Sequence, residues 1–101
     1  MDINRVKARE MVQGLIDQCN RVDNSDRRAV DSLREKSATI ARQIFGETTV
    51  YLKLMREVKY HPESVSSLAD PTIEANRARA NGVNKLAAIL REMLMEVLTG
   101  R

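Results

Sequence analysis

Residues 70–100 read DPTIEANRARANGVNKLAAILREMLMEVLTG, and this stretch is the strongest indicator of the fold. Asp70 can accept hydrogen bonds from the first backbone N–H groups of a helix, and Pro71 suits the first helical position. Apolar residues then recur at helical spacing as far as Val97, and Gly100 is a typical terminator. The pattern predicts a long last helix with a polar first half and an apolar second half. Its expected apolar positions are Ile73, Ala80, Val83, Leu86, Ala87, Leu90, Met93, Leu94 and Val97.

Two further long helices are predicted earlier in the chain, over residues 2–21 and 26–45. Asn24 or Ser25 is the expected N-cap of the second, and Gly46 is expected to have a positive φ after its end. Gly14 lies inside the first helix, where either a neighbouring helix approaches closely or the helix is locally weak, and we favour the close approach. The expected apolar stripes are Ala8, Met11, Val12, Leu15, Ile16, Cys19 and Val22, then Val30, Leu33, Ser37, Ile40, Ala41, Ile44 and Phe45.

A short helix is expected at residues 50–58, with Val50, Tyr51, Leu54, Met55 and Val58 on its apolar stripe. The sequence Tyr60-His61-Pro62 then breaks the helical pattern and begins the longest connection, which extends to Asp70.

The composition supports an all-α fold. The chain has 101 residues, of which 43% are hydrophobic and 31% charged, as expected for one folded domain over residues 1–101. Four Gly, two Pro and three aromatic residues argue against a β-sandwich or barrel. We therefore expect an antiparallel helical bundle of three long helices and one short helix.

The sequence also argues against a disulfide framework, a metal site and a membrane span. One cysteine and one histidine cannot supply a disulfide framework or a zinc site, so we expect no metal and no cofactor. The longest unbroken apolar run, residues 86–90, is far shorter than the roughly 20 residues of a membrane span. No targeting segment is recognisable, and we expect a cytoplasmic protein that has no membrane partner.

The apolar second half of the last helix supports the first functional hypothesis, a non-catalytic protein–protein interaction module. Met93, Met95 and Leu98 extend its apolar surface over more than one stripe, and we expect Met93 and Met95 to be exposed. Such a surface would contact another protein or a second copy in a homodimer. Burial of this half within the bundle is the alternative that remains open.

Nucleic-acid binding is the second hypothesis. The net charge of +3 and a pI near 9.4 permit phosphate contacts. Along most of the chain, Lys and Arg alternate with Asp and Glu as on a solvated surface. At the start of the last helix, however, Arg77, Arg79 and Lys85 lie close together with Glu74 as the only nearby acid, and these three are the candidates for phosphate or base contacts.

Arg56 and His61 support a third hypothesis, because their separation by four residues resembles the Arg-x(4–6)-His signature of HEPN ribonucleases, which are helical bundles. A histidine can move a proton while an arginine stabilises a phosphorane. The chain departs from that family at Glu57, where asparagine is common, and at Pro62, which would end the helix. With twelve arginines in the chain, this spacing arises readily by chance.

A further resemblance rests on spaced residues between positions 40 and 98. Ile44-Phe45-Gly46-Glu47, Tyr51, Tyr60-His61-Pro62, Gly82 and the closing segment 90–98 resemble a small helical module of bacterial phage-defence proteins, where it accompanies TIR-like and nucleotide-binding effector domains. The chain departs from that pattern at Arg79, where the module has an aromatic residue. The resemblance implies an adaptor or sensor that transmits partner or oligomer state, and it carries over no site residues.

Overall fold

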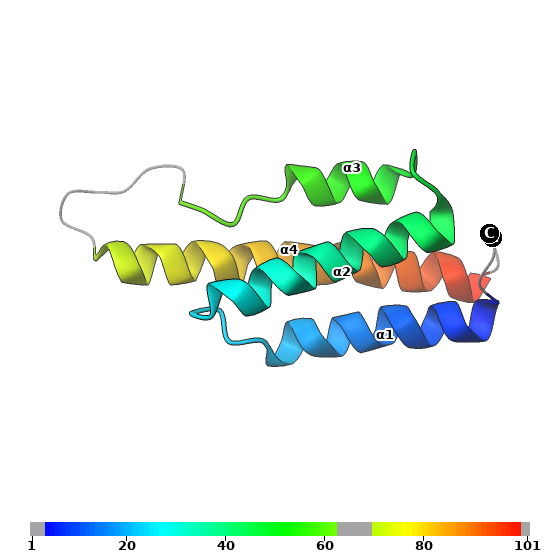
Figure 1. Cartoon of the computed structure of the whole chain (residues 1–101), viewed down its shortest axis with the longest axis horizontal. Helices are drawn as coiled ribbons and strands as arrows, with labels where there is room; N and C mark the ends of the chain where they lie inside the picture. The colour runs from blue at the N-terminus through cyan, green and yellow to red at the C-terminus, as the bar shows by residue number, and fades with distance from the viewer. Residues whose placement is uncertain (1–3, 63–69, 100–101) are drawn as a thin grey trace.

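The computed structural model describes residues 4–62 and 70–99, which form four helices and no strand. These are α1 (Arg5–Arg21), α2 (Arg27–Phe45), α3 (Val50–Glu57) and α4 (Pro71–Thr99). Successive helices run in opposite directions and make one elongated bundle, whose extents are 50 × 25 × 20 Å (Figure 1). The predicted antiparallel bundle of three long helices and one short helix is confirmed.

The start of α2 is set by Asp26. Its Oδ1 accepts a hydrogen bond from the backbone N–H of Ala29 at 3.1 Å, which satisfies one of the free donors of the first turn. The prediction of Asn24 or Ser25 as the N-cap was therefore wrong. The Ser25 backbone N–H and hydroxyl instead donate to Oδ1 of Asp23, at 2.9 and 2.6 Å, in a turn that precedes the cap.

The start of α4 follows the sequence prediction. Asp70 Oδ1 accepts hydrogen bonds from the backbone N–H groups of Thr72 and Ile73, at 2.8 and 3.4 Å, and Pro71 is the first helical residue. Gly46, just after α2, has a φ of +94°, which confirms the expected positive φ.

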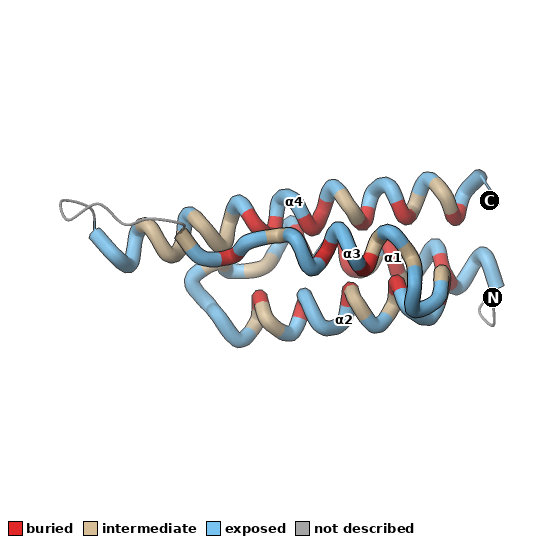
Figure 2. The backbone as a smooth tube through the Cα atoms, turned by 90° about the horizontal axis from the view of Figure 1, so that it is seen from above, coloured by how far each residue is buried: buried red, intermediate tan, exposed pale blue. Residues whose placement is uncertain are grey.

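The apolar stripes of α1, α2 and α4 meet in one core, where the buried residues face inward (Figure 2). The stripe predicted for α3 was partly wrong, because Leu52 and Met55 are the buried residues while Val50 and Leu54 are exposed. Apolar side chains occupy most of α3, so their spacing alone does not select the buried face.

Helix α4 is longer than each of the other helices, and its first turns extend past the ends of α1 and α2 (Figure 1). Ile73 lies in this extension and is exposed, contrary to its place in the predicted stripe. Among the described residues, no helix is long and apolar enough to cross a membrane.

The two glycines inside long helices have opposite surroundings. A Cβ atom at residue 82 would lie 2.5 Å from Cδ1 of Tyr60 and 2.9 Å from the carbonyl oxygen of Lys59, so the chain after α3 packs directly on α4. A Cβ atom at residue 14 would have no neighbour within 4 Å. The close approach predicted at Gly14 is therefore wrong, and the close approach occurs at Gly82.

These two glycines make a matched test of the packing of Tyr60 on α4. Gly14→Ala should raise the free energy of unfolding by about 0.5–1 kcal/mol, because alanine favours the helix and nothing obstructs its methyl group. Gly82→Ala should lower it by about 1–3 kcal/mol, because the methyl group displaces Tyr60 and the Lys59 carbonyl. Urea unfolding followed by circular dichroism measures both values. Stabilisation by both substitutions would contradict the close contact at Gly82.

Candidate functional site

Tyr60 connects three elements of the bundle. Its ring is buried, with only 4% of its surface exposed, and it lies against α4 at Gly82. The guanidinium carbon of Arg34, on α2, lies 4.1 Å from the centroid of the ring in a cation–π contact. Burial raises the pKa of the Tyr60 phenol to about 12, an effect that the neighbouring Arg34 guanidinium partly opposes.

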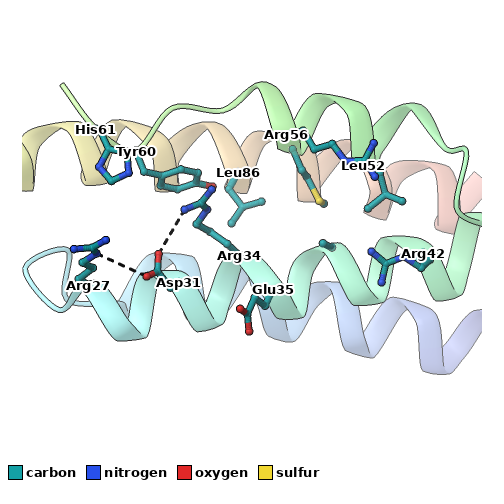
Figure 3. A pocket seen from close by; sticks show the side chains of 12 residues that line it. Arg27, Asp31, Arg34, Glu35, Arg42, Leu52, Arg56, Tyr60, His61 and Leu86 are labelled. Carbon is teal, nitrogen blue, oxygen red and sulfur yellow. Dashed lines mark hydrogen bonds and ion pairs between the residues drawn. The ribbon is translucent and has the colours of Figure 1, made fainter. Parts of the chain in front are cut away.

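A groove of about 460 Å³ runs between α2 and the segment formed by α3 and residues 58–61 (Figure 3). Tyr60, Leu52 and Leu86 are buried residues that contribute its apolar lining. Its charged and titratable lining residues are Arg27, Asp31, Arg34, Glu35, Arg42, Arg56 and His61. We call this space the first groove.

A second groove of about 300 Å³ lies between residues 59–62 and the first half of α4. His61 lines both grooves, so the two are neighbours on the surface. The charged and titratable residues of the second groove are Lys59, His61, Glu74, Arg77 and Lys85. We call the lining residues of the two grooves together the basic face.

Positive charge is concentrated on the basic face. Among the described residues it carries seven Lys or Arg side chains and three carboxylates, a net charge of +4 when His61 is not counted. The whole chain has a net charge of +3, from 17 basic and 14 acidic residues. The described residues outside the basic face, nine basic and nine acidic, therefore carry no net charge, so the positive charge is not spread evenly over the part of the chain that the structure describes.

The three carboxylates of the basic face neutralise it only in part. Asp31 lies between two arginines, with its carboxylate 3.9 Å from Nε of Arg27 and 3.5 Å from Nη1 of Arg34. Glu74 pairs with Arg77 at 3.7 Å. The Glu35 side chain points away from α3 in Figure 3. These pairs are partly exposed, so each contributes little stability and leaves the cations accessible to an anionic ligand.

Arg79, a predicted nucleic-acid contact, has an internal structural role instead. Its Nε donates a hydrogen bond to the Asn24 carbonyl oxygen at 2.6 Å, and its Nη2 donates to the side chain of Asn76. The first bond joins α4 to the turn between α1 and α2. Arg79 lines neither groove, whereas the other two predicted residues, Arg77 and Lys85, both line the second groove.

Arg56 and His61 both line the first groove, but they lie at opposite ends of it. In Figure 3, His61 lies at the end near Arg27 and Tyr60, and the Arg56 guanidinium lies at the other end near Leu52. Joint action on one phosphate requires both groups within hydrogen-bond reach of it, and this arrangement does not bring them together.

Two of the three predicted partner-binding residues are at the surface. Met95 and Leu98 are 59% and 48% exposed, whereas Met93 is completely buried, so the expectation that Met93 is exposed was wrong. Leu98 and Leu94 line a third groove of about 500 Å³, between α1 and α4, which also includes Gly14. The open space above Gly14 belongs to this groove, which we call the α1–α4 groove.

The spacing of three arginines in the sequence indicates the first groove, although acidic residues alternate with them along the chain. Arg27, Arg34 and Arg42 are separated by seven and eight residues, close to two helical turns each, so they share one face of α2. The sequence pattern places Tyr60 in a loop, although large aromatic side chains are commonly buried. Its partner Arg34 lies 26 positions earlier, and no local pattern connects them.

The comparisons with known proteins give no family assignment. No family model, curated protein or solved structure matches the chain. The resemblance to a phage-defence module therefore stays a prediction. In the described part of the chain, no three His, Cys, Asp or Glu residues are grouped so that they could hold a metal ion.

Alkaline pH should destabilise the protein through Tyr60. The folded-state pKa of about 12 lies above the ordinary value of about 10, so folding favours the neutral phenol. This contribution of roughly 2–3 kcal/mol is complete below pH 10 and is lost between about pH 10 and pH 12. Over this interval the unfolding free energy of the parent should fall more than that of Tyr60→Phe, as measured by urea unfolding. Equal slopes would contradict the buried phenol.

Proposed function

We propose that this protein is a non-catalytic cytoplasmic binding module whose basic face binds the phosphate backbone of a nucleic acid. The observation that carries this proposal is the net charge of +4 on the basic face, which equals the net charge of all the described residues together, 16 basic and 12 acidic. Contacts between phosphates and Lys or Arg supply most non-specific nucleic-acid affinity. Five of the seven cations are arginines, whose planar guanidinium can hold two phosphate oxygens at once.

This proposal places nucleic acid ahead of protein as the ligand, whereas the sequence pattern favoured a protein partner. The reason is that the cations of α2, α3 and α4 line neighbouring grooves, while the exposed apolar residues are few. Isolated exposed apolar side chains are common on soluble proteins, but concentrated charge of one sign is more specific. An adaptor or sensor role in phage defence is compatible with nucleic-acid binding and is part of the proposal.

Removal of two cations from the second groove should weaken nucleic-acid binding. We expect the parent to bind a short fluorescent oligonucleotide with an affinity that falls steeply between about 50 and 200 mM salt. Arg77→Ala combined with Lys85→Ala should lower the affinity roughly tenfold and reduce the slope of log K against log salt by about 2. Fluorescence anisotropy measures both quantities.

The matched control is Arg5→Ala combined with Lys7→Ala, which removes the same charge from exposed positions of α1 outside the basic face and outside the α1–α4 groove. It should leave the affinity close to that of the parent. Equal weakening by the two double variants, or no binding by the parent at low salt, would overturn the proposal. The oligonucleotide should also stay intact, because Arg56 and His61 lie apart. RNA cleavage that His61→Ala abolishes would contradict the non-catalytic assignment.

The α1–α4 groove supports self-association as a second function. Leu94 and Leu98 give it an apolar side, and its rim carries Arg9 together with Glu10 and Asp17. A surface with both charges can be complementary to itself, as the two-fold interface of a homodimer requires. The exposed Met95 follows Leu94 directly on α4 and extends this apolar surface.

Leu98 provides the test of self-association. The mass measured by light scattering should rise with protein concentration, and Leu98→Glu should abolish the rise because it places a charge on the apolar side of the groove. Leu54→Glu is the control, since Leu54 lies on α3 and is similarly exposed at 40%, against 48% for Leu98. A constant monomer mass in the parent, or the same loss with both substitutions, would refute a dimer through this groove.

A further inference from the structure

We infer that the first groove binds an unpaired stretch of nucleic acid and that one base stacks on the guanidinium of Arg34. This inference rests on the proposed function and adds to it the strandedness of the ligand and a base-contacting residue. Its basis is the order of groups along the groove, where cations at both ends enclose a planar, partly apolar centre.

The planar centre is the contact between Arg34 and Tyr60. The guanidinium carbon lies over the ring, 4.1 Å from its centroid, so the ring shields part of the guanidinium. The Arg34 side chain nevertheless remains 41% exposed and lines the groove. The exposed part of this planar guanidinium is therefore available to a ligand in the groove. Proteins commonly stack unpaired bases on arginine planes and aromatic rings.

This surface is held in place before any ligand arrives. Tyr60 is buried against α4 at Gly82, and Asp31 lies 3.5 Å from Nη1 of Arg34. A guanidinium that is already positioned loses less conformational entropy when a base stacks on it. Arg34 thus differs from the other groove arginines, for which no contact with an aromatic ring is found in the described part of the chain.

The ends of the first groove suit phosphates of one strand that are several nucleotides apart, because Arg27 and Arg42 lie fifteen residues, about 22 Å, apart along α2. Arg27 and His61 lie at one end, and Arg42 and Arg56 lie at the other (Figure 3). Between them the lining includes the buried apolar side chain of Leu86, and the buried Leu52 lies close to Arg56 (Figure 3). An extended strand of several nucleotides, with phosphates at both ends and a base between them, matches this order of charge, apolar surface and charge.

A double helix does not fit this arrangement. Its bases are stacked on one another and present only their edges in the grooves, so no base face is available to Arg34. The first groove, at about 460 Å³, has the volume of a small-ligand pocket rather than of a surface that receives a duplex. A duplex could contact its rim, but the stacking surface would remain empty.

The test compares a single-stranded oligonucleotide with an abasic strand of the same length, which has the phosphates without the bases. By fluorescence anisotropy, the parent should prefer the base-containing strand roughly tenfold, as expected for one stacked base. Arg34→Lys keeps the positive charge but removes the plane, so the preference should fall to near one. Arg28→Lys should retain it, because Arg28 is an exposed residue of α2 that lines neither groove. Thermal unfolding of each variant establishes that it is folded.

The outcomes separate this inference from the proposed function. Equal binding of the abasic and base-containing strands by the parent would overturn the stacking inference and leave phosphate binding standing. Tighter binding of a duplex than of the single strand would also overturn it. No binding of either strand by the parent at low salt would overturn both. Because the comparison of strands uses the unaltered protein, an Arg34→Lys variant that fails to fold would not prevent the test.

Discussion

Tyr60 can lie against α4 only because residue 82 has no side chain. The chain leaves α3 at Glu57, and the space at Gly82 lets Tyr60 and the Lys59 carbonyl approach the α4 backbone. With its ring buried there, Tyr60 presents a surface to α2 on which the Arg34 guanidinium lies. A larger residue at position 82 would displace the ring and with it the wall that α3 and residues 58–61 provide for the first groove.

The position of Tyr60 also determines where the charges meet. His61 follows it directly and lines both grooves, which brings the arginines of α2 next to Arg77 and Lys85 of α4. If the chain after α3 did not pack on α4, these cations would be separate solvated groups. Their proximity creates a local positive potential that a net charge of +3, distributed evenly, would not produce.

Helix α4 divides the surface into two parts of different chemistry. Its first turns extend past α1 and α2, and its first half carries Arg77 and Lys85 beside the second groove. Its second half packs against α1, where Met93 is enclosed and Leu98 remains at the edge of the α1–α4 groove. Because the basic face and the α1–α4 groove are lined by different residues, the proposed nucleic-acid binding and the proposed self-association would not compete for the same side chains.

The sequence by itself determined the four helices and their approximate bounds, because capping and apolar spacing act between residues a few positions apart. Asp70, Pro71 and Gly46 are such local signals, and the structure confirms each of them. The sequence could not determine the buried side of α3, because apolar residues occupy most of its positions. The tertiary structure alone decided that Arg79 holds the turn between α1 and α2, and that Arg34 lies on Tyr60. These contacts join residues 55 and 26 positions apart, and they depend on how whole helices pack rather than on neighbouring residues.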